Sequence, residues 1–217
     1  MNQIMKSALA LGLYLIFVGV TTAHAGYIDA SDNEWRSLTD TTNLTWNQVD
    51  SVCNDTTFAC FGSVTNIDGI SIDMTGWTWA SQDDVSTLFT ELIGAPIPAS
   101  GVYYHVDNNS AWAPAAVASL GITRAVSRYT QSVGFTRELF PIPGTGTVAK
   151  ISDFHAANKV DYAQINHRDT VSDPHHNIGH FLYRQVDVPE PSTLALLALS
   201  LGGLGFARRA PNSGIRR

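Results

Sequence analysis

Four residues suited to acid–base or metal chemistry lie together in the segment DTVSDPHHNIGH: Asp173, His175, His176 and His180. On a helix, the four-residue spacing of His176 and His180 would place two imidazoles side by side, where they could bind a metal ion. Pro174 and Gly179 favour a loop instead, and no glutamate accompanies the histidines. We therefore predict a polar loop whose histidines can titrate near neutral pH, with no metal and no cofactor.

A second group combines aromatic rings with amide and carboxylate side chains in VYYHVDNN and NNSAWAP. Exposed rings can stack on the apolar faces of sugars while amides bind the hydroxyls. The candidate carbohydrate-binding residues are Tyr103, Tyr104, Asp107, Asn108 and Trp112. The favoured alternative is that aromatic residues fill the interior, which we expect above all of Trp35, Trp46, Trp77 and Trp79.

No motif for catalysis accompanies these residues. The chain has no Gly-x-Ser-x-Gly turn, no glycine loop for phosphate and no surroundings typical of a catalytic cysteine. We predict that the protein is not an enzyme. A hydrolase would require a pocket that collects His, Asp and Ser within hydrogen-bond distance.

The only two cysteines, Cys53 and Cys60, occur in CNDTTFAC. In an exported chain such a pair predicts a disulfide. The alternative is a metal site, but the usual CxxC pairs are missing.

Two helices are predicted around these residues. In TWNQVDSVC, Thr45 and Gln48 have the spacing of a capping box, and Trp46, Val49 and Cys53 share one face.

The segment SQDDVSTLFTELIG repeats this pattern, with Ser81 and Asp84 as the capping pair. Its core stripe consists of Val85, Leu88, Phe89 and Leu92. Gly94 and Pro96 end the helix. A third helix is predicted between Pro114 and Gly121.

The remaining segments predict short strands at 27–30, 102–106, 122–129, 148–151, 160–165 and 180–186. We predict an α+β fold in which two or three helices pack on a small antiparallel sheet. A β-sandwich is the alternative.

The first 25 residues have the pattern of a secretory signal peptide. Lys6 precedes an apolar run at 8–20, and Ala23-His24-Ala25 resembles a cleavage site. An anchor helix is the alternative, but the run is short for a membrane span. We expect export through the Sec translocon and cleavage after Ala25.

The exported part is acidic. Residues 26–190 contain eight Lys or Arg and nineteen Asp or Glu residues, a difference of −11. This charge argues against binding of nucleic acid or anionic lipid. The length of 26–187 fits one extracytoplasmic domain.

The last segment, 188–217, has three parts: VPEPST, an apolar run and a basic tail. The prolines break the chain, and a short helix at about 193–207 follows. By its length the helix is marginal for a membrane span, with an interfacial or core helix as the alternative. Arg208 and Arg209 favour a transmembrane helix with the arginines inside.

This tail resembles the PEP-CTERM sorting signal. The resemblance implies recognition and processing by an exosortase, an integral-membrane cysteine protease, near Pro189, Glu190 and Pro191. The corresponding sorting-signal residues are Val188, Pro189, Glu190, Pro191, Arg208 and Arg209. It also implies passage through the cytoplasmic (inner) membrane to the cell surface or an exopolysaccharide matrix.

The segments EWRSLTDTTNLTWNQV, GWTWASQDDVSTLF and HFLYRQVDVPEPS resemble the domain that many PEP-CTERM proteins carry. The same order is similar to C-type-lectin-like domains, with two helices and closure by a late strand. The calcium-dependent sugar motifs of true lectins, Glu-Pro-Asn and Trp-Asn-Asp, are absent. The sequence therefore predicts a non-enzymatic envelope or matrix protein, with a carbohydrate-binding module as the alternative.

Overall fold

The computed structural model describes residues 26–104, 110–155 and 159–186, and these form a mixed α/β fold with three sheets. The largest sheet has the strand order β11-β8-β9-β10-β6, and β7 pairs with β8 beside this path. Only the β11–β8 pair is parallel among the strand pairs of the described residues. The strands are β6 (Val102–Tyr104), β7 (Arg124–Val126), β8 (Tyr129–Leu139), β9 (Thr145–Phe154), β10 (Tyr162–Thr170) and β11 (Gly179–His180).

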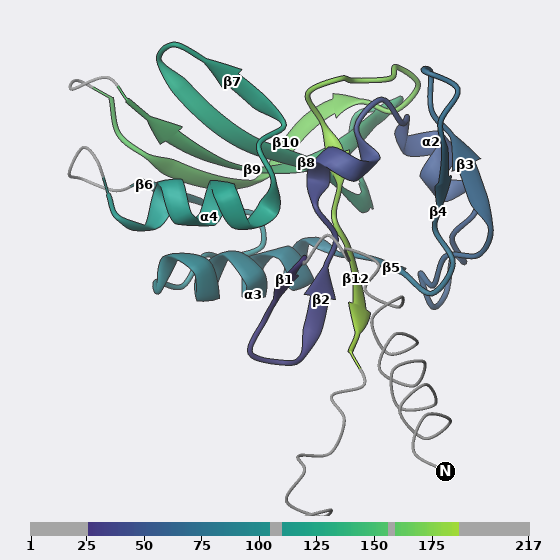
Figure 1. The fold of residues 1–217 in the computed structure, drawn as a ribbon, viewed down its shortest axis with the longest axis horizontal. Helices are drawn as coiled ribbons and strands as arrows, with labels where there is room; N and C mark the ends of the chain where they lie inside the picture. Colours follow the sequence, from purple (N-terminus) through teal and green to yellow (C-terminus); the bar gives the residue numbers. More distant parts are fainter. Residues whose placement is uncertain (1–25, 105–109, 156–158, 187–217) are drawn as a thin grey trace, which may run out of the picture.

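Two smaller sheets lie beside the large one (Figure 1). The first has the order β1-β2-β12-β5, with β1 (Tyr27–Ile28), β2 (Asn33–Trp35), β5 (Thr78–Trp79) and β12 (Leu182–Gln185). The second is the hairpin of β3 (Ser63–Thr65) and β4 (Ser71–Asp73). Because β12 pairs antiparallel with β2, the two ends of the described domain lie together, with Tyr183 opposite Trp35.

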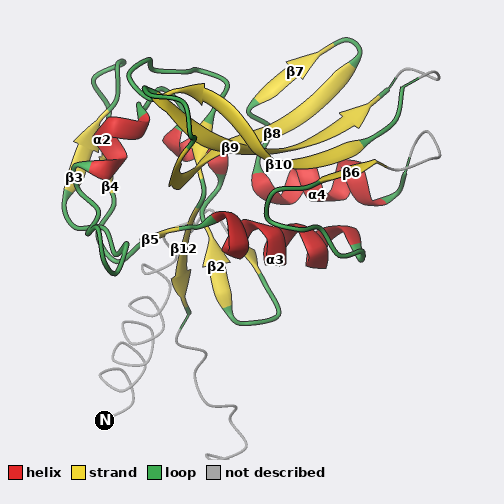
Figure 2. Cartoon of the chain, turned by 180° about the vertical axis from the view of Figure 1, so that it is seen from behind, coloured by secondary structure: helices red, strands yellow, loops and turns green. Residues whose placement is uncertain are grey.

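Helices α3 (Gln82–Ile93) and α4 (Trp112–Leu120) cover one face of the large sheet (Figures 1 and 2). Strand side chains alternate between faces, so Ala149 and Ile151 of β9 point toward these helices. They join a core with Leu88, Phe89 and residues of α4. The opposite face of this sheet therefore carries Lys150 and Ser152.

A second core lies at one end of that opposite face, beneath α2 (Trp46–Asp50) and the β3–β4 hairpin. The 3-10 helix η1 (Leu38–Thr41) instead contributes Leu38 to the first core. The indole Nε1 of Trp46 donates to the carbonyl of Thr136 over 3.0 Å. A Cβ at Gly146 would lie 2.8 Å from Trp46 Cδ1, so the indole packs directly on the β9 backbone. This core leaves the rest of the face uncovered by α2 and the hairpin.

The predicted capping boxes are both present. Thr45 accepts from the Gln48 amide and Ser81 from the Asp84 amide, and each third residue bonds back to the cap. Gly94 ends α3 with φ 74°. Helix α2 ends at Asp50, before the predicted Cys53, and α4 begins at Trp112, two residues before Pro114.

The α+β class with mostly antiparallel pairing is confirmed, whereas the strand bounds needed correction. The predicted strand at 122–129 is confirmed only in part: β7 lies within it, but the chain then turns and forms the β7–β8 hairpin. Strands β9 and β10 extend beyond the predictions, and the predicted strand at 180–186 is divided between β11 and β12. Strands β2, β3, β4 and β5, and all of β8 except Tyr129, were missed. The β-sandwich alternative is wrong, because helices α3 and α4, and not a second sheet, cover one face of the large sheet (Figure 1).

The predicted signal peptide at 1–25 and the predicted helix at 193–207 lie outside the described residues. Within the part of the chain that the structure describes, no helix is long and apolar enough to cross a membrane.

Candidate functional site on the polar face of the large sheet

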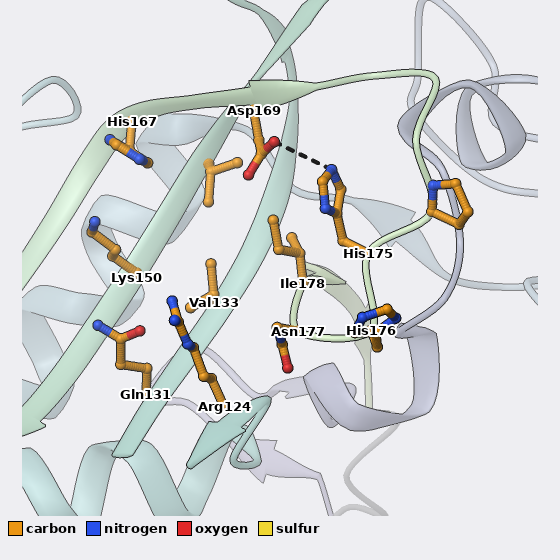
Figure 3. Close-up of a pocket in the computed structure, with 12 residues that line it drawn as sticks. Arg124, Gln131, Val133, Lys150, His167, Asp169, His175, His176, Asn177 and Ile178 are labelled. Atoms are coloured by element: carbon orange, nitrogen blue, oxygen red, sulfur yellow. Dashed lines mark ion pairs between the residues drawn. The ribbon is translucent and has the colours of Figure 1, made fainter. Parts of the chain in front are cut away.

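A cleft of about 250 Å³ opens on the face of the large sheet that α3 and α4 leave uncovered. The strand register places Gln131 opposite Ser152 and Val133 opposite Lys150. Buried Val133 and Val148 form the floor. The rest of the lining comes from four strands and one loop: Arg124 of β7, Gln131 of β8, Lys150 of β9, His167 and Asp169 of β10, and residues 174–178 (Figure 3).

A β-bulge in β10 decides which of its side chains face the cleft. The register shifts between Gln164 and His167, and Asn166 has φ 68°. Asparagine tolerates this left-handed conformation better than most residues. Without the extra residue, the alternation of strand side chains would place Arg168 instead of His167 and Asp169 on the cleft side.

The carboxylate of Asp169 links the strand wall of the cleft to the loop wall. Its Oδ1 lies 3.2 Å from Nε2 of His175, within ion-pair distance but without hydrogen-bond alignment (Figure 3). The pair becomes ionic only when the imidazole is protonated. Oδ1 also accepts from the Thr170 amide over 2.8 Å, which fixes the carboxylate.

His167 is held in its neutral form. Burial lowers its pKa first, and the nearby positive charges of Lys150 and Arg168 lower it further, while Asp169 acts in the opposite direction. At neutral pH the permanent charges lining the cleft are therefore those of Arg124, Lys150 and Asp169.

A row of partly exposed aromatic rings continues the same face beyond the cleft. The ring centroids of Tyr129 and Phe154 are 5.3 Å apart, and those of Phe154 and Tyr162 are 5.9 Å apart. The Arg124 guanidinium lies 5.4 Å from the Tyr129 ring and the Lys150 ammonium 5.4 Å from the Tyr162 ring. Arg124 and Lys150 therefore belong both to the cleft and to the aromatic row.

The carbohydrate-binding residues predicted from sequence lie elsewhere. Tyr103 and Trp112 contact each other at 6.0 Å and pack against the core on the α3–α4 side. The backbone of Tyr104 pairs with Tyr162, and Asp107 and Asn108 lie outside the described residues. Sugar binding by this group stays a prediction.

The structure separates the histidines of the predicted loop. His175 and His176 line the cleft, whereas His180 is fully buried in β11 between Trp79 and Phe135, at centroid distances of 5.8 and 5.4 Å. Burial lowers the pKa of His180 to about 3, so this residue is neutral. The described ranges contain no cluster of three or more His, Cys, Asp or Glu residues that could hold a metal ion.

The predicted disulfide between Cys53 and Cys60 is present. It joins the end of α2 to the segment before β3, where the two cysteines also form an isolated β-bridge. Cys60 is fully buried in the second core, so the disulfide has a structural position.

The cleft and the aromatic row were not predicted from the sequence, because they combine residues from four separate strands. One signal was available: polar and aromatic residues alternate with small or branched apolar ones in YAQIN and AKIS. That alternation is typical of a sheet with one buried and one wet face.

The model of the PEP-CTERM protein-sorting motif matches residues 187–209. The chain therefore carries a PEP-CTERM sorting motif, which implies export, membrane-anchored sorting and exosortase processing. The sorting-signal residues predicted above, from Val188 to Arg209, lie in the matched segment and outside the described residues. No curated protein and no solved structure matches the chain.

Proposed function

We propose that this protein is a non-enzymatic component of the cell envelope or of an exopolysaccharide matrix, delivered there by exosortase processing of its C-terminal tail. The sorting motif at 187–209 is the observation that carries the proposal. Export begins at the Sec translocon with residues 1–25. The helix predicted from sequence at about 193–207 then holds the chain in the inner membrane, with Arg208 and Arg209 on the cytoplasmic side.

The position of the tail relative to the folded domain supports this order of events. Strand β12 ends at Gln185, and the amide of Val186 donates to the carbonyl of Asp32 over 2.9 Å. The matched segment begins at the next residue. A cut near Pro189–Pro191 therefore leaves every described strand and helix within the released domain.

The cleft supports a binding role better than a catalytic one. Its lining within the described residues includes no serine, threonine or cysteine that could act as a nucleophile beside His175 and Asp169. The three histidines of the cleft do not converge on a metal site in the described ranges.

A second candidate function is that of a carbohydrate-binding module for exopolysaccharide. The aromatic row beside a polar cleft favours it, because rings and hydrogen-bonding groups together suit sugars. A C-type-lectin-like fold is part of this candidate, and closure of the domain by the late strand β12 against β2 agrees with it.

The proposed function is tested by altering the tail in the native host. Deletion of 188–217, or the triple change Pro189→Ala, Glu190→Ala, Pro191→Ala, should abolish processing and change the location of the domain. Arg216→Gln with Arg217→Gln, outside the matched segment, is the control and should leave both unchanged. Unaltered location and mature mass in the triple variant would refute the proposal.

A further inference from the structure

We propose that the polar face of the large sheet binds an anionic polysaccharide, a glycan chain whose sugars carry carboxylates. In this arrangement Arg124 and Lys150 bind the carboxylates, and the rings of Tyr129, Phe154 and Tyr162 stack on the sugars. The inference deepens the proposed function. It rests on that function only for the location, the cell envelope or matrix, in which the protein meets the glycan.

Local charge is the first observation that points to an anionic ligand. Residues 26–190 have an excess of eleven acidic groups, yet the cleft has two cations and one carboxylate among its permanent charges. The carboxylate, that of Asp169, is already within ion-pair distance of His175. An acidic protein that keeps two cations together on one face presents a local site for negative charge.

The placement of the two cations is the second observation. Arg124 and Lys150 each lie beside an aromatic ring, and they come from strands on either side of β8. In Figure 3 both side chains reach toward the same side of the cleft as Gln131. A guanidinium can bind a carboxylate through two parallel hydrogen bonds, and an ammonium adds a point charge.

The aromatic row argues for a sugar rather than for any other anion. Tyr129, Phe154 and Tyr162 are partly exposed and lie on three adjacent strands. Such rings offer flat apolar surfaces, while the partly exposed Gln164 beside them offers hydrogen-bonding groups for hydroxyls. Gln131 and Ser152 of the same face are buried, and a 2.7 Å hydrogen bond joins their side chains.

The length of the face suits a chain rather than a single sugar. On β9 the cleft begins at Val148 and the aromatic row ends at Phe154. At the rise of a β-strand, these six steps span about 20 Å. The same face therefore offers a cationic cleft at one end and aromatic rings at the other.

The experiment measures binding of the full-length chain, in detergent, to three soluble polymers: alginate as a polyuronate, neutral dextran and dextran sulfate. We expect binding to alginate that weakens as salt is raised, and no binding to dextran. Lys150→Gln and Arg124→Gln should each weaken alginate binding roughly tenfold, the effect of losing one charge-assisted hydrogen bond. Phe154→Ala should weaken it as well.

Arg168→Gln is the matched control, because Arg168 is an exposed cation on β10 that the bulge turns away from the cleft. Its alginate affinity should stay within about twofold of the parent value. Should Phe154→Ala lose its fold, the two charge variants still decide the question.

Three results would overturn the inference. The first is no binding to alginate, and the second is an equal loss of alginate affinity in Lys150→Gln and Arg168→Gln. The third is an affinity for dextran sulfate that equals the affinity for alginate and does not change in Phe154→Ala. The mature mass of Lys150→Gln in the native host should be that of the parent chain. A binding failure with normal processing therefore refutes this inference and leaves the proposed function standing.

Discussion

The ammonium of Lys150 on β9 lies 5.4 Å from the ring centroid of Tyr162 on β10. The pair is diagonal across two neighbouring strands, because Lys150 is opposite Gln164 and Tyr162 is opposite Ser152. Lys150 is half-buried on the polar face and makes no contribution to either core. Lys150 is therefore positioned to bind a ligand at the surface and is not needed for packing of the cores.

We expect Lys150→Gln to change the free energy of unfolding by less than about 1 kcal/mol, the range of a partly exposed cation–π contact. Urea denaturation of the variant and of the Arg168→Gln control would measure this. A loss of more than about 3 kcal/mol would show that Lys150 is structural and would remove its use as a binding probe.

The capping box of α3 predicts a clear stability effect. In Ser81→Ala the Asp84 amide loses its acceptor, the Ser81 hydroxyl, at 3.0 Å. The free energy of unfolding should fall by about 1 kcal/mol. Thr87→Ala, an exposed hydroxyl change on the same helix, is the control and should stay within about 0.5 kcal/mol. Equal effects of the two changes would contradict the role given to the cap.

Buried His180 should make the fold sensitive to acid. Its pKa is about 3 in the folded chain and about 6.5 when exposed, so protons bind preferentially to the unfolded state. The stability that the neutral imidazole supports is complete above pH 6.5 and is lost as the pH falls toward 3. Between pH 7 and pH 5 the loss should be about 2 kcal/mol.

Urea denaturation at these two pH values, with His180→Phe and His176→Phe, tests this effect. Phenylalanine at 180 does not titrate, so the difference between pH 7 and pH 5 should shrink. The exposed His176 variant should keep the parent difference. If His180→Phe retains it in full, another group is responsible.

The absence of a side chain at Gly179 lets the loop that lines the cleft pack closely on the backbone of η1. A Cβ at this position would lie 2.1 Å from the carbonyl oxygen of Leu38, a backbone atom that cannot swing aside. We expect Gly179→Ala to cost about 1–3 kcal/mol in thermal unfolding, the range for overpacked positions. Asn177→Ala, on the exposed part of the same loop, should be near neutral, and a similar loss there would contradict the explanation.

Local features of the fold could be predicted from the sequence, because their causes lie within a few residues. Thr45 with Gln48, and Ser81 with Asp84, are only three residues apart, and each pair forms its predicted cap. The disulfide depended on two cysteines alone. The tail could be recognised because its proline-broken, apolar and basic parts follow one another directly.

The ligand site could not be predicted in the same way, because long-range register creates it. Arg124, Lys150 and Asp169 meet only when β7, β8, β9 and β10 are paired, and a single bulge residue decides that Asp169 faces the cleft. The same alternation places Tyr103 on the helix-covered side of β6. The sequence identified an aromatic segment but not the face to which each ring belongs.

The most direct test of the central claim is the intact mass of the protein recovered from its native host. Exosortase sorting predicts a chain shorter than the 23.5 kDa full-length form at both ends. It should lack residues 1–25 and the tail beyond a point near Pro189–Pro191, apart from any group joined there. Recovery of a chain that still ends at Arg217 would contradict the account.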